Sequence, residues 1–505
     1  MTISSDPLSG YVYHLTQSQE AKLRELWILL FNSAASVLSA VYDVPIPQGS
    51  PHQLFEALDN IQEPSVDAIL AALNKEKPTS SAANNLSTSD TNGENKEQKA
   101  LDKMESLINK EAEKNIISEM ASRKVTPEHF SMLFKQLRDM GVPESEIKSM
   151  QTILSKLGPE EMVFAVLKMI KQEHPDALLL RFLRARKWDV GKAFAMMTSA
   201  ILWRKEIEVD DDIMPKGELH ALQQAEDEKL SSAARKEGQD FISQFEMGKS
   251  YLHGFDKQGR PIGVVRVCLH KPGAQSQKTL ERYIVHTIET TRILVTPPVE
   301  TGGIVFDMTG FGLSNMVVTN LALEYSPVKF IIKCFEANYP ESLGILLIHN
   351  APWIFSGFWK IIHGWMDPVV ASKVHFTRSA DDLEKFIPRE NIPKELGGEK
   401  EWEYEYVKPK PDENTVMQDT KTRDALMFER MMIGLRLLAA TAAWISSTTF
   451  SEKEDEKTVK ELKAKREAIV EEFQSNYWKL DPYVRARALI DRTGVLEPDG
   501  TVTVS

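Results

Sequence analysis

The sequence YPESLGILLIHNAPWIFSGFWKIIHGWMDPVVASK, residues Tyr339–Lys373, decides the fold. It predicts a turn, a short apolar strand at Gly344–Ile348, a sharp exit at Asn350–Pro352 and then a strongly apolar helix. From Trp353 to Met366, 9 of the 14 residues are large and apolar. A surface helix carries a broad polar face, so this helix is expected in a core or at the edge of an apolar cavity or a membrane.

Strands and helices alternate on both sides of this segment. Apolar runs predict strands at Ile262–Leu269, Gly303–Asp307, Gly344–Ile348 and Lys373–Thr377. Helical patterns separate them at Thr279–Leu294, Met316–Asn338 and Trp353–Met366. This alternation predicts an α/β fold with helical crossovers.

The rest of the chain predicts helical regions around that α/β part. We expect a helical N-terminal extension (1–73), a disordered linker (74–99), a helical region (100–210), the α/β domain (245–406) and a helical C-terminal extension (407–505). The run Met431–Ile445 is too short to span a membrane and contains Arg436, so it predicts a buried or partner-packing helix. Ser451–Phe473 has dense mixed charge, which favours a solvated face over a coiled-coil contact. Asn476–Gly494 is expected to dock, with the first helical region as its partner.

Composition excludes several classes of function. The net charge of −12 argues against nucleic-acid binding and against general attraction to anionic lipid. Only two cysteines occur, Cys268 and Cys334, and no secretory signal is evident at the N-terminus. These features predict a cytoplasmic protein in a reducing compartment.

Signatures of catalysis are scarce. The sequence has no nucleophile elbow, phosphate loop, H-E-x-x-H or paired C-x-x-C motif, so we expect no metal, no cofactor and no enzymatic activity. The run Asp307–Gly312 follows a strand but lacks the order of a dinucleotide-binding loop, so Asp307 is expected to act in a turn or cap. His349 is expected to be a satisfied core histidine. A hydrolase or dehydrogenase on the same topology, and a scaffold for protein binding, remain as alternatives.

Three further blocks carry a family resemblance. They are DALLLRFLRARKWDVGKAFAMM (Asp176–Met197), HGFDKQGRPIGVVRV (His253–Val267) and IPRENIPKELGGE (Ile387–Glu399). Together with Tyr339–Lys373, which lies between the second and third of them, these blocks resemble the CRAL-TRIO lipid-transfer family, including its fungal phosphatidylinositol-transfer members. The blocks also follow one another in the order found in that family. The resemblance covers Gln172–Tyr406. It implies a small mixed or parallel sheet with covering helices around an apolar cavity. It also implies one bound lipid, phosphatidylinositol or an apolar terpenoid such as squalene, exchanged during transient peripheral contact with membranes.

The resemblance also implies a headgroup site. Arg186, Lys187, Glu341 and Lys373 fall on family positions that face the headgroup of phosphatidylinositol. Cations pair with a phosphodiester, and a carboxylate accepts hydrogen bonds from inositol hydroxyls. From the residues alone, the basic cluster at Arg181–Lys187 could equally be solvated or could cap a helix, and Glu341 with Lys373 could be a structural ion pair.

The apolar helix is the candidate gate of the cavity. Its flexing points are expected at Gly357, Gly364 and Pro368. The residues expected at the cavity and gate are Ile304, Phe306, Ile354, Phe355, Phe358, Ile362, Trp365 and Met366.

Two departures from the family pattern bear on the ligand. Val370 stands where phosphatidylinositol binders often carry threonine, and Gly302 and Ile304 stand where phosphatidylcholine binders present small hydroxyl residues. Each missing hydrogen bond to a buried polar group costs roughly 1–3 kcal/mol, so phosphatidylcholine is expected to bind weakly.

Overall fold

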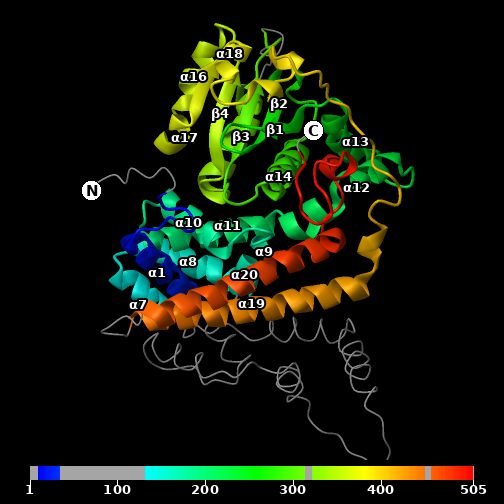
Figure 1. Cartoon of the computed structure of the whole chain (residues 1–505). Coiled ribbons are helices and arrows are strands. Elements are labelled where there is room, and N and C mark those ends of the chain that lie inside the picture. Colours follow the sequence, from blue (N-terminus) through cyan, green and yellow to red (C-terminus); the bar gives the residue numbers. More distant parts are fainter. Residues whose placement is uncertain (1–8, 34–130, 158, 313–320, 450–455, 504–505) are drawn as a thin grey trace, which may run out of the picture. The chain divides into compact units, whose positions relative to one another are not determined.

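The computed structural model describes residues 9–33, 131–157, 159–312, 321–449 and 456–503, and the fold concerns these residues (Figure 1). The chain divides into two compact units, each made of segments distant in sequence. The first comprises residues 1–23, 170–420 and 474–505, and the second comprises residues 24–169 and 421–473.

The second unit is helical in its described part. It contains α7 (Ser131–Asp139), α8 (Glu144–Leu157), α9 (Pro159–Met169), nearly all of α19 (Thr420–Thr449), most of α1 (Gln17–Ser33) and the first part of α20 (Glu456–Val484). Trp27 is completely buried, and the guanidinium of Arg466 lies 5.8 Å from its ring. Arg466 is itself buried, and its Nε donates to Thr441 Oγ1 at 2.8 Å. The long charged helix therefore contributes a buried polar contact to this core.

The apolar run Met431–Ile445 lies inside α19 and is packed in the second unit. Leu437, Leu438 and Ile445 are at most 1% exposed, which confirms the prediction of a buried helix. Among the described residues, no helix combines the length and the apolar character that a membrane span requires. The linker predicted at 74–99 lies outside the described residues.

The first unit contains a five-stranded mixed sheet. Its strands are β1 (Ser250–Phe255), β2 (Pro261–Arg266), β3 (Gly302–Asp307), β4 (Leu343–His349) and β5 (Val374–Thr377), in the spatial order β1-β2-β3-β4-β5. Strands β2 to β5 are mutually parallel, and β1 joins β2 as an antiparallel hairpin. Parallel neighbours need crossovers. These contain α14 (Gln277–Ile293), α15 (Leu321–Lys333) with its π-helical continuation η5 (Cys334–Asn338), and α16 (Phe355–His363) with α17 (Pro368–Ser372).

The sequence predicted this sheet with small errors. Four strands were predicted and are observed, with ends displaced by a few residues. Strand β1 was not predicted, because its sequence includes Gly254, whose positive φ of 67° lies at an irregularity in the β1–β2 pairing. The apolar helix was predicted from Trp353 to Met366 but extends only from Phe355 to His363. Residues 316–320 of another predicted helix lie outside the described part.

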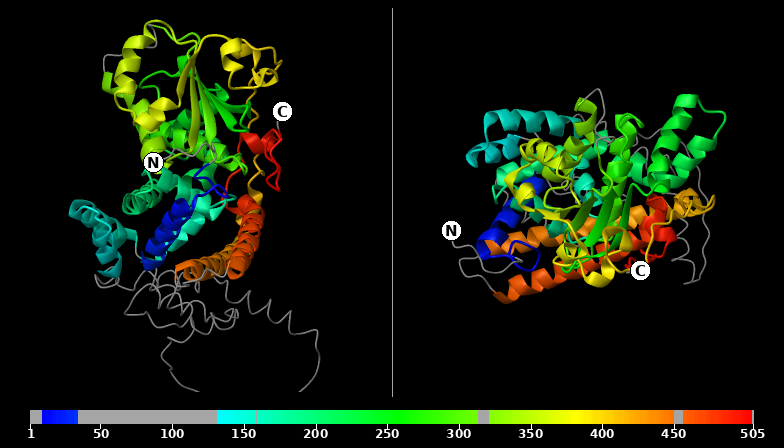
Figure 2. Two further views of the ribbon diagram at one scale, coloured as in Figure 1. Left: turned by 60° about the vertical axis from the view of Figure 1, so that its left-hand side comes forward. Right: turned by 90° about the horizontal axis from the view of Figure 1, so that it is seen from above.

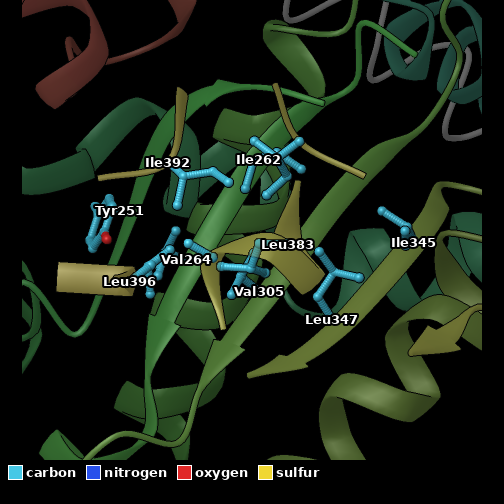
Figure 3. Close-up of a cluster of buried hydrophobic side chains, with 11 residues drawn as sticks. Tyr251, Ile262, Val264, Val305, Ile345, Leu347, Leu383, Ile392 and Leu396 are labelled. Carbon is cyan, nitrogen blue, oxygen red and sulfur yellow. The ribbon is translucent and has the colours of Figure 1, made fainter. Parts of the chain in front are cut away.

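One sheet face is closed by the segment that follows β5. Alternate residues of the strands point to this face: Tyr251, Ile262, Val264, Val305, Ile345 and Leu347 (Figure 3). Ala380, Leu383, Ile387, Ile392 and Leu396 cover them, from α18 (Ala380–Leu383) and the 3₁₀ turns η6 (Arg389–Asn391) and η7 (Lys394–Leu396). The IPRENIPKELGGE block is thus the apolar cover of the first sheet face.

The remaining elements of the first unit are helical. They are α10 (Pro175–Ala185), α11 (Val190–Glu206), η2 (Val209–Ile213), α12 (Met214–Glu226), α13 (Ser232–Glu246), η3 (Val267–Leu269), η8 (Thr415–Gln418) and α21 (Leu489–Arg492). The C-terminal segment predicted to dock, Asn476–Gly494, docks on α12. Ala486 N donates to Met214 O at 2.9 Å, and Leu489 N donates to Glu218 Oε1 at 3.0 Å. Docking was expected, but these contacts are with α12 and not with the first helical region.

Candidate functional site

The second face of the sheet is apolar and only partly covered. We define the second sheet face by Ile304, Phe306, Leu346, Ile348, Val374 and Phe376, which lie at alternate positions of β3, β4 and β5. Leu346 and Ile348 are buried, whereas Ile304 and Phe306 are only half-buried and Phe376 is 50% exposed. Such incomplete burial of a contiguous apolar surface is uncommon in a folded core and marks a binding surface.

Helix α16 lies against this face and against α15, on the side opposite to α18 (Figure 2, left). Ile362 is the buried centre of its contact with Ile332 of α15. The Trp359 ring meets the Phe376 ring edge-on at 5.2 Å between centroids. The partly buried residues packed around this contact include the predicted gate residues Phe355, Phe358, Trp365 and Met366. The predicted gate residues Ile304, Phe306 and Ile354 are half-buried.

The exposed positions of α16 and its flanks carry apolar side chains among polar ones, since Ser356, Lys360 and His363 are exposed as well. Trp353, in the turn before the helix, is 87% exposed, and Ile361 is 45% exposed. Val369 of α17 adds a further exposed apolar side chain, 41% exposed. The inner side of α16 is therefore apolar, and its exposed side is mixed, with Trp353, Ile361 and Val369 as its exposed apolar side chains.

The C-terminal end of α16 is fastened by polar contacts. Glu336 Oε1 of η5 accepts a hydrogen bond from Asp367 N at 2.5 Å, and the Lys329 ammonium lies 4.6 Å from the Trp365 ring centroid. An open groove of about 340 Å³ lies here, lined by Lys329, Ile332, Lys333, Glu336, Ala337 and Trp365. Of the predicted flexing points, Gly364 has an ordinary helical φ of −67°, so its conformation does not require glycine.

Two of the predicted headgroup residues lie together. Lys373 Nζ and Glu341 Oε2 are 3.1 Å apart, with side chains 18% and 17% exposed. Lys373 follows α17 directly before β5, and Glu341 lies in the turn before β4. Glu341 has a φ of 54°, and a non-glycine residue in this left-handed region costs of order 1–3 kcal/mol. The structure therefore places a charged pair at the amino ends of two neighbouring parallel strands, on a strained turn.

The other two predicted headgroup residues, Arg186 and Lys187, directly follow α10. Arg186 is half-buried and its Nη1 donates to Ala185 O at 3.4 Å, while Lys187 is exposed with a φ of 52°. In the described part of the chain, no hydrogen bond or ion pair joins either residue to Glu341 or Lys373. The remaining basic residues of the cluster are structural, since Arg181 pairs with Glu173 at 2.5 Å and Arg184 pairs with Glu300 at 2.9 Å.

A buried ionic network lies behind the strained turn, and it was not predicted from the sequence. Glu289 of α14 is completely buried and contacts Arg204 Nη1 at 2.5 Å and Lys171 Nζ at 2.6 Å. Burial alone would raise the pKa of Glu289, but the neighbouring cations outweigh burial and hold it well below its usual value. The guanidinium of Arg292 lies 5.8 Å from the ring of Tyr339, whose pKa is raised well above normal by burial and then by the charge of Glu289.

This network reaches the candidate site through Tyr339. That tyrosine is 4% exposed and lies two residues before Glu341 in the YPES turn. The turn is therefore held from behind by buried charges. The spacing of these charges in sequence (171, 204, 289, 292) has no period, so only the tertiary structure reveals the network.

Two residues that invited chemical interpretations have structural roles. Asp307 Oδ1 accepts from Thr309 N at 2.9 Å, which is the turn contact expected for it. His349 is 1% exposed, and its Nδ1 lies 3.0 Å from Thr377 Oγ1. Burial lowers the pKa of His349, as expected for a neutral core histidine. No group of three or more His, Cys, Asp or Glu within the described ranges is arranged to hold a metal ion.

Comparison with known proteins supports one family. The model of the CRAL/TRIO domain matches residues 245–398, and that of the CRAL/TRIO N-terminal domain matches residues 146–199. Phosphatidylinositol transfer protein CSR1 of Eremothecium gossypii is 36% identical over 505 residues, covering 98% of this chain and 100% of that protein. A CRAL-TRIO domain-containing protein of Schizosaccharomyces pombe, C3H8.02, is 37% identical, covering 71% of this chain and 74% of that protein.

Among solved structures, Sfh5 matches with a TM-score of 0.35 and 16% identity, covering 48% of this chain and 83% of that one. The sequence matches are the stronger finding, because they include both domain models and extend along nearly the whole chain. The mixed sheet, its helical crossovers and these matches agree, and the chain belongs to the CRAL-TRIO family.

Proposed function

We propose that this protein binds a single lipid, phosphatidylinositol or an apolar terpenoid such as squalene, and exchanges it at membranes. The observation that carries the proposal is the second sheet face, an apolar surface covered incompletely by α16. The relative that aligns along its whole length is named a phosphatidylinositol transfer protein, which agrees with this reading. The protein acts as a carrier and needs no catalytic step.

The energetics of an acyl chain explain why a carrier needs a gate. Burying one CH₂ contributes about 0.8 kcal/mol, so a chain of about sixteen carbons is held by roughly 13 kcal/mol against release into water. Release into water is therefore very slow. Exchange of one lipid for another at a bilayer is nearly isoenergetic, because both lipids keep an apolar environment.

Helix α16 is the proposed gate. Its contacts with α15 and β5 are apolar, and Trp353, Ile361 and Val369, in the helix and its flanking turns, expose apolar side chains to solvent. A bilayer would solvate those side chains while α16 moves from the second sheet face. This contact is peripheral and transient, and it depends on apolar surface because the net charge of −12 disfavours anionic membranes. The protein would accordingly work in the cytoplasm at membrane surfaces.

The direct test of the function is the lipid content of the protein. Mass spectrometry of lipids extracted from protein purified without detergent is expected to find one lipid per chain, with phosphatidylinositol or an apolar terpenoid enriched over its cellular share. Transfer of that lipid between vesicles is the second measurement. Protein that carries no lipid and transfers none would contradict the proposal and favour the scaffold alternative, and turnover of the lipid to a product would favour the enzyme alternative.

If α16 is the gate, charged substitutions in it should slow lipid exchange more than they reduce lipid binding. Replacing Phe358, which packs in the contact between α15 and α16, by Asp places a charge on a surface that must cross an apolar interface. We expect Phe358→Asp to slow lipid exchange between vesicles more than it lowers the lipid bound at equilibrium. Trp365→Asp is expected to behave alike. Lys360→Asp, on an exposed position of the same helix, is the control. Exchange at the wild-type rate in both variants would place the gate elsewhere.

Ligand preference follows from the second sheet face. Ile304 and Phe306 offer no hydroxyl to a polar headgroup, and a desolvated polar group left unpaired is rejected more strongly than a missing methylene. We therefore expect phosphatidylcholine to compete poorly against phosphatidylinositol or squalene. Displacement of fluorescent phosphatidylcholine by each rival measures the preference. Equal binding of phosphatidylcholine would show that these strand residues do not line the headgroup pocket.

A further inference from the structure

The segment Ser9–His14, which we call the N-terminal strap, lies against the C-terminal end of α10 (the blue coil beside α10 in Figure 1). Its contacts converge on Arg184. The Nη1 atom of Arg184 donates to Gly10 O at 2.8 Å, and the guanidinium lies 4.1 Å from the Tyr11 ring centroid. The strap also reaches the carboxylate that pairs with Arg184, because Val12 N lies 3.4 Å from Glu300 Oε1.

The strap also touches Trp188. Gly10 has a φ of 93°, and a Cβ atom added there would lie 3.0 Å from Trp188 Cζ2. The main chain of the strap can approach the indole this closely because residue 10 has no side chain. Arg184 and Trp188 are thus both held by the strap, one on each side of the Arg186–Lys187 pair.

The turn between these two anchors is strained. Lys187 and Trp188 have consecutive φ values of 52° and 66°, a left-handed conformation that side-chain-bearing residues rarely adopt. Trp188 N donates to Leu183 O at 2.7 Å, and Asp189 N donates to Arg186 O at 3.0 Å. Such a conformation persists where the surroundings determine it from several directions. The strap supplies contacts that these local hydrogen bonds do not.

We propose that Gly10 and Tyr11 are positioning residues, which hold the turn so that Arg186 and Lys187 face the phosphodiester of the bound lipid. This inference rests on the proposed function. The guanidinium of Arg184 contacts Glu300, Tyr11 and Gly10. Its charge is therefore used in holding the strap and is not directed at a ligand. Lys187 is exposed, so its ammonium is accessible to a ligand. The chemical class that the turn selects is a lipid with an anionic phosphodiester.

The experiment compares two ligands and two strap positions in the full-length chain. Tyr11→Ala removes the ring beneath Arg184, and Gly10→Ala inserts a Cβ against Trp188. We expect roughly two- to fivefold weaker binding of phosphatidylinositol in Tyr11→Ala, the effect of losing one partly exposed cation–π contact. Binding of squalene, which has no phosphate, is expected to stay unchanged. Tyr11→Phe keeps the aromatic ring and is expected to bind as wild type.

A second measurement does not depend on lipid. Amide hydrogen exchange of residues 184–189 in lipid-free protein is expected to be faster in Tyr11→Ala and Gly10→Ala than in wild type. Tyr13→Ala is the matched control on the same strap, because Tyr13 is 75% exposed and contacts His174 instead, at 5.9 Å between ring centroids. It is expected to leave both exchange and binding unchanged.

The outcomes separate this inference from the proposed function. Arg186→Ala with Lys187→Ala is measured in parallel. Weak phosphatidylinositol binding in that double variant together with normal binding and exchange in the strap variants would overturn the strap inference and leave the function standing. Normal binding in the double variant would overturn the headgroup assignment itself. Equal loss of squalene and phosphatidylinositol in Tyr11→Ala, with a lower melting temperature, would show a merely structural strap.

Discussion

Replacing Lys373 by Ala is expected to weaken phosphatidylinositol loading strongly while leaving the melting temperature almost unchanged. The lysine is paired with Glu341 at 3.1 Å on a partly exposed surface, so little folding energy depends on it. A charge-assisted contact to the lipid phosphate contributes roughly 1.5–3 kcal/mol, so loading falls about ten- to hundredfold. Loading is measured by titration with vesicles containing phosphatidylinositol. Arg186→Ala with Lys187→Ala is expected to give a loss of the same kind.

Lys257→Ala provides the matched control for both variants. Lys257 is exposed, and its backbone N–H, which the substitution keeps, donates to Phe386 O at 2.8 Å. Unchanged loading in Lys373→Ala and in the double variant would refute the headgroup assignment. A large loss of stability in Lys373→Ala would instead identify the pair with Glu341 as a structural one.

The second large effect concerns folding. Arg204→Ala is expected to destabilise the protein by about 3–5 kcal/mol, because it removes the cation paired with Asp210 and one of the cations paired with the buried Glu289. Arg204 contacts Glu289 at 2.5 Å and Asp210 at 2.8 Å, and Glu289 is completely buried. The midpoint of urea unfolding, followed by circular dichroism, measures the loss. Arg389→Ala is the matched control, since Arg389 likewise pairs with carboxylates, three of them, but at the surface. An equal shift in both variants would contradict the prediction.

The same network predicts how stability depends on pH. The folded-state pKa of Glu289 lies well below its usual value, because the nearby cations outweigh burial. A lowered pKa contributes stability that is present above the unfolded value of about 4.3 and is lost as the pH falls further. We expect the unfolding midpoint to fall as the pH drops below that value. In Glu289→Gln this acid dependence should be shallower, although the variant is less stable at neutral pH.

Much of the fold could be predicted because its elements are locally encoded. The strand of β4 and the apolar helix α16 carry their periodicity in short windows, and both were found near their predicted places. Strand β1 was missed because Gly254 and the irregular pairing beside it break the alternation on which strand prediction depends. Helix α16 was predicted too long at both ends. Trp353 and Met366 are apolar like the helix, but they lie in the turns that flank it.

The site could be predicted less completely than the fold. Resemblance indicated Glu341 and Lys373, and the structure brings these two together across a sequence separation of 32 residues. The network around Glu289 could not be predicted, since its members come from α11, α14 and the segment before α10. A charged residue in a helix is usually solvated, and only tertiary structure reveals that this one is buried. The strap was unpredictable for the same reason, because Gly10 and Arg184 are 174 residues apart.

The docking of the terminal segment on α12 has a consequence for synthesis of the chain. Glu218 is completely buried, and its carboxylate accepts from Tyr406 Oη at 2.7 Å and from Leu489 N at 3.0 Å and pairs with Arg492. Burial raises the pKa of Glu218, so without these partners its charge would be costly to enclose. Domains usually fold as they leave the ribosome, N-terminal parts first. Here Glu218 lacks its cation until Arg492 has been synthesised, 274 residues later, so the packing around α12 is completed late in translation.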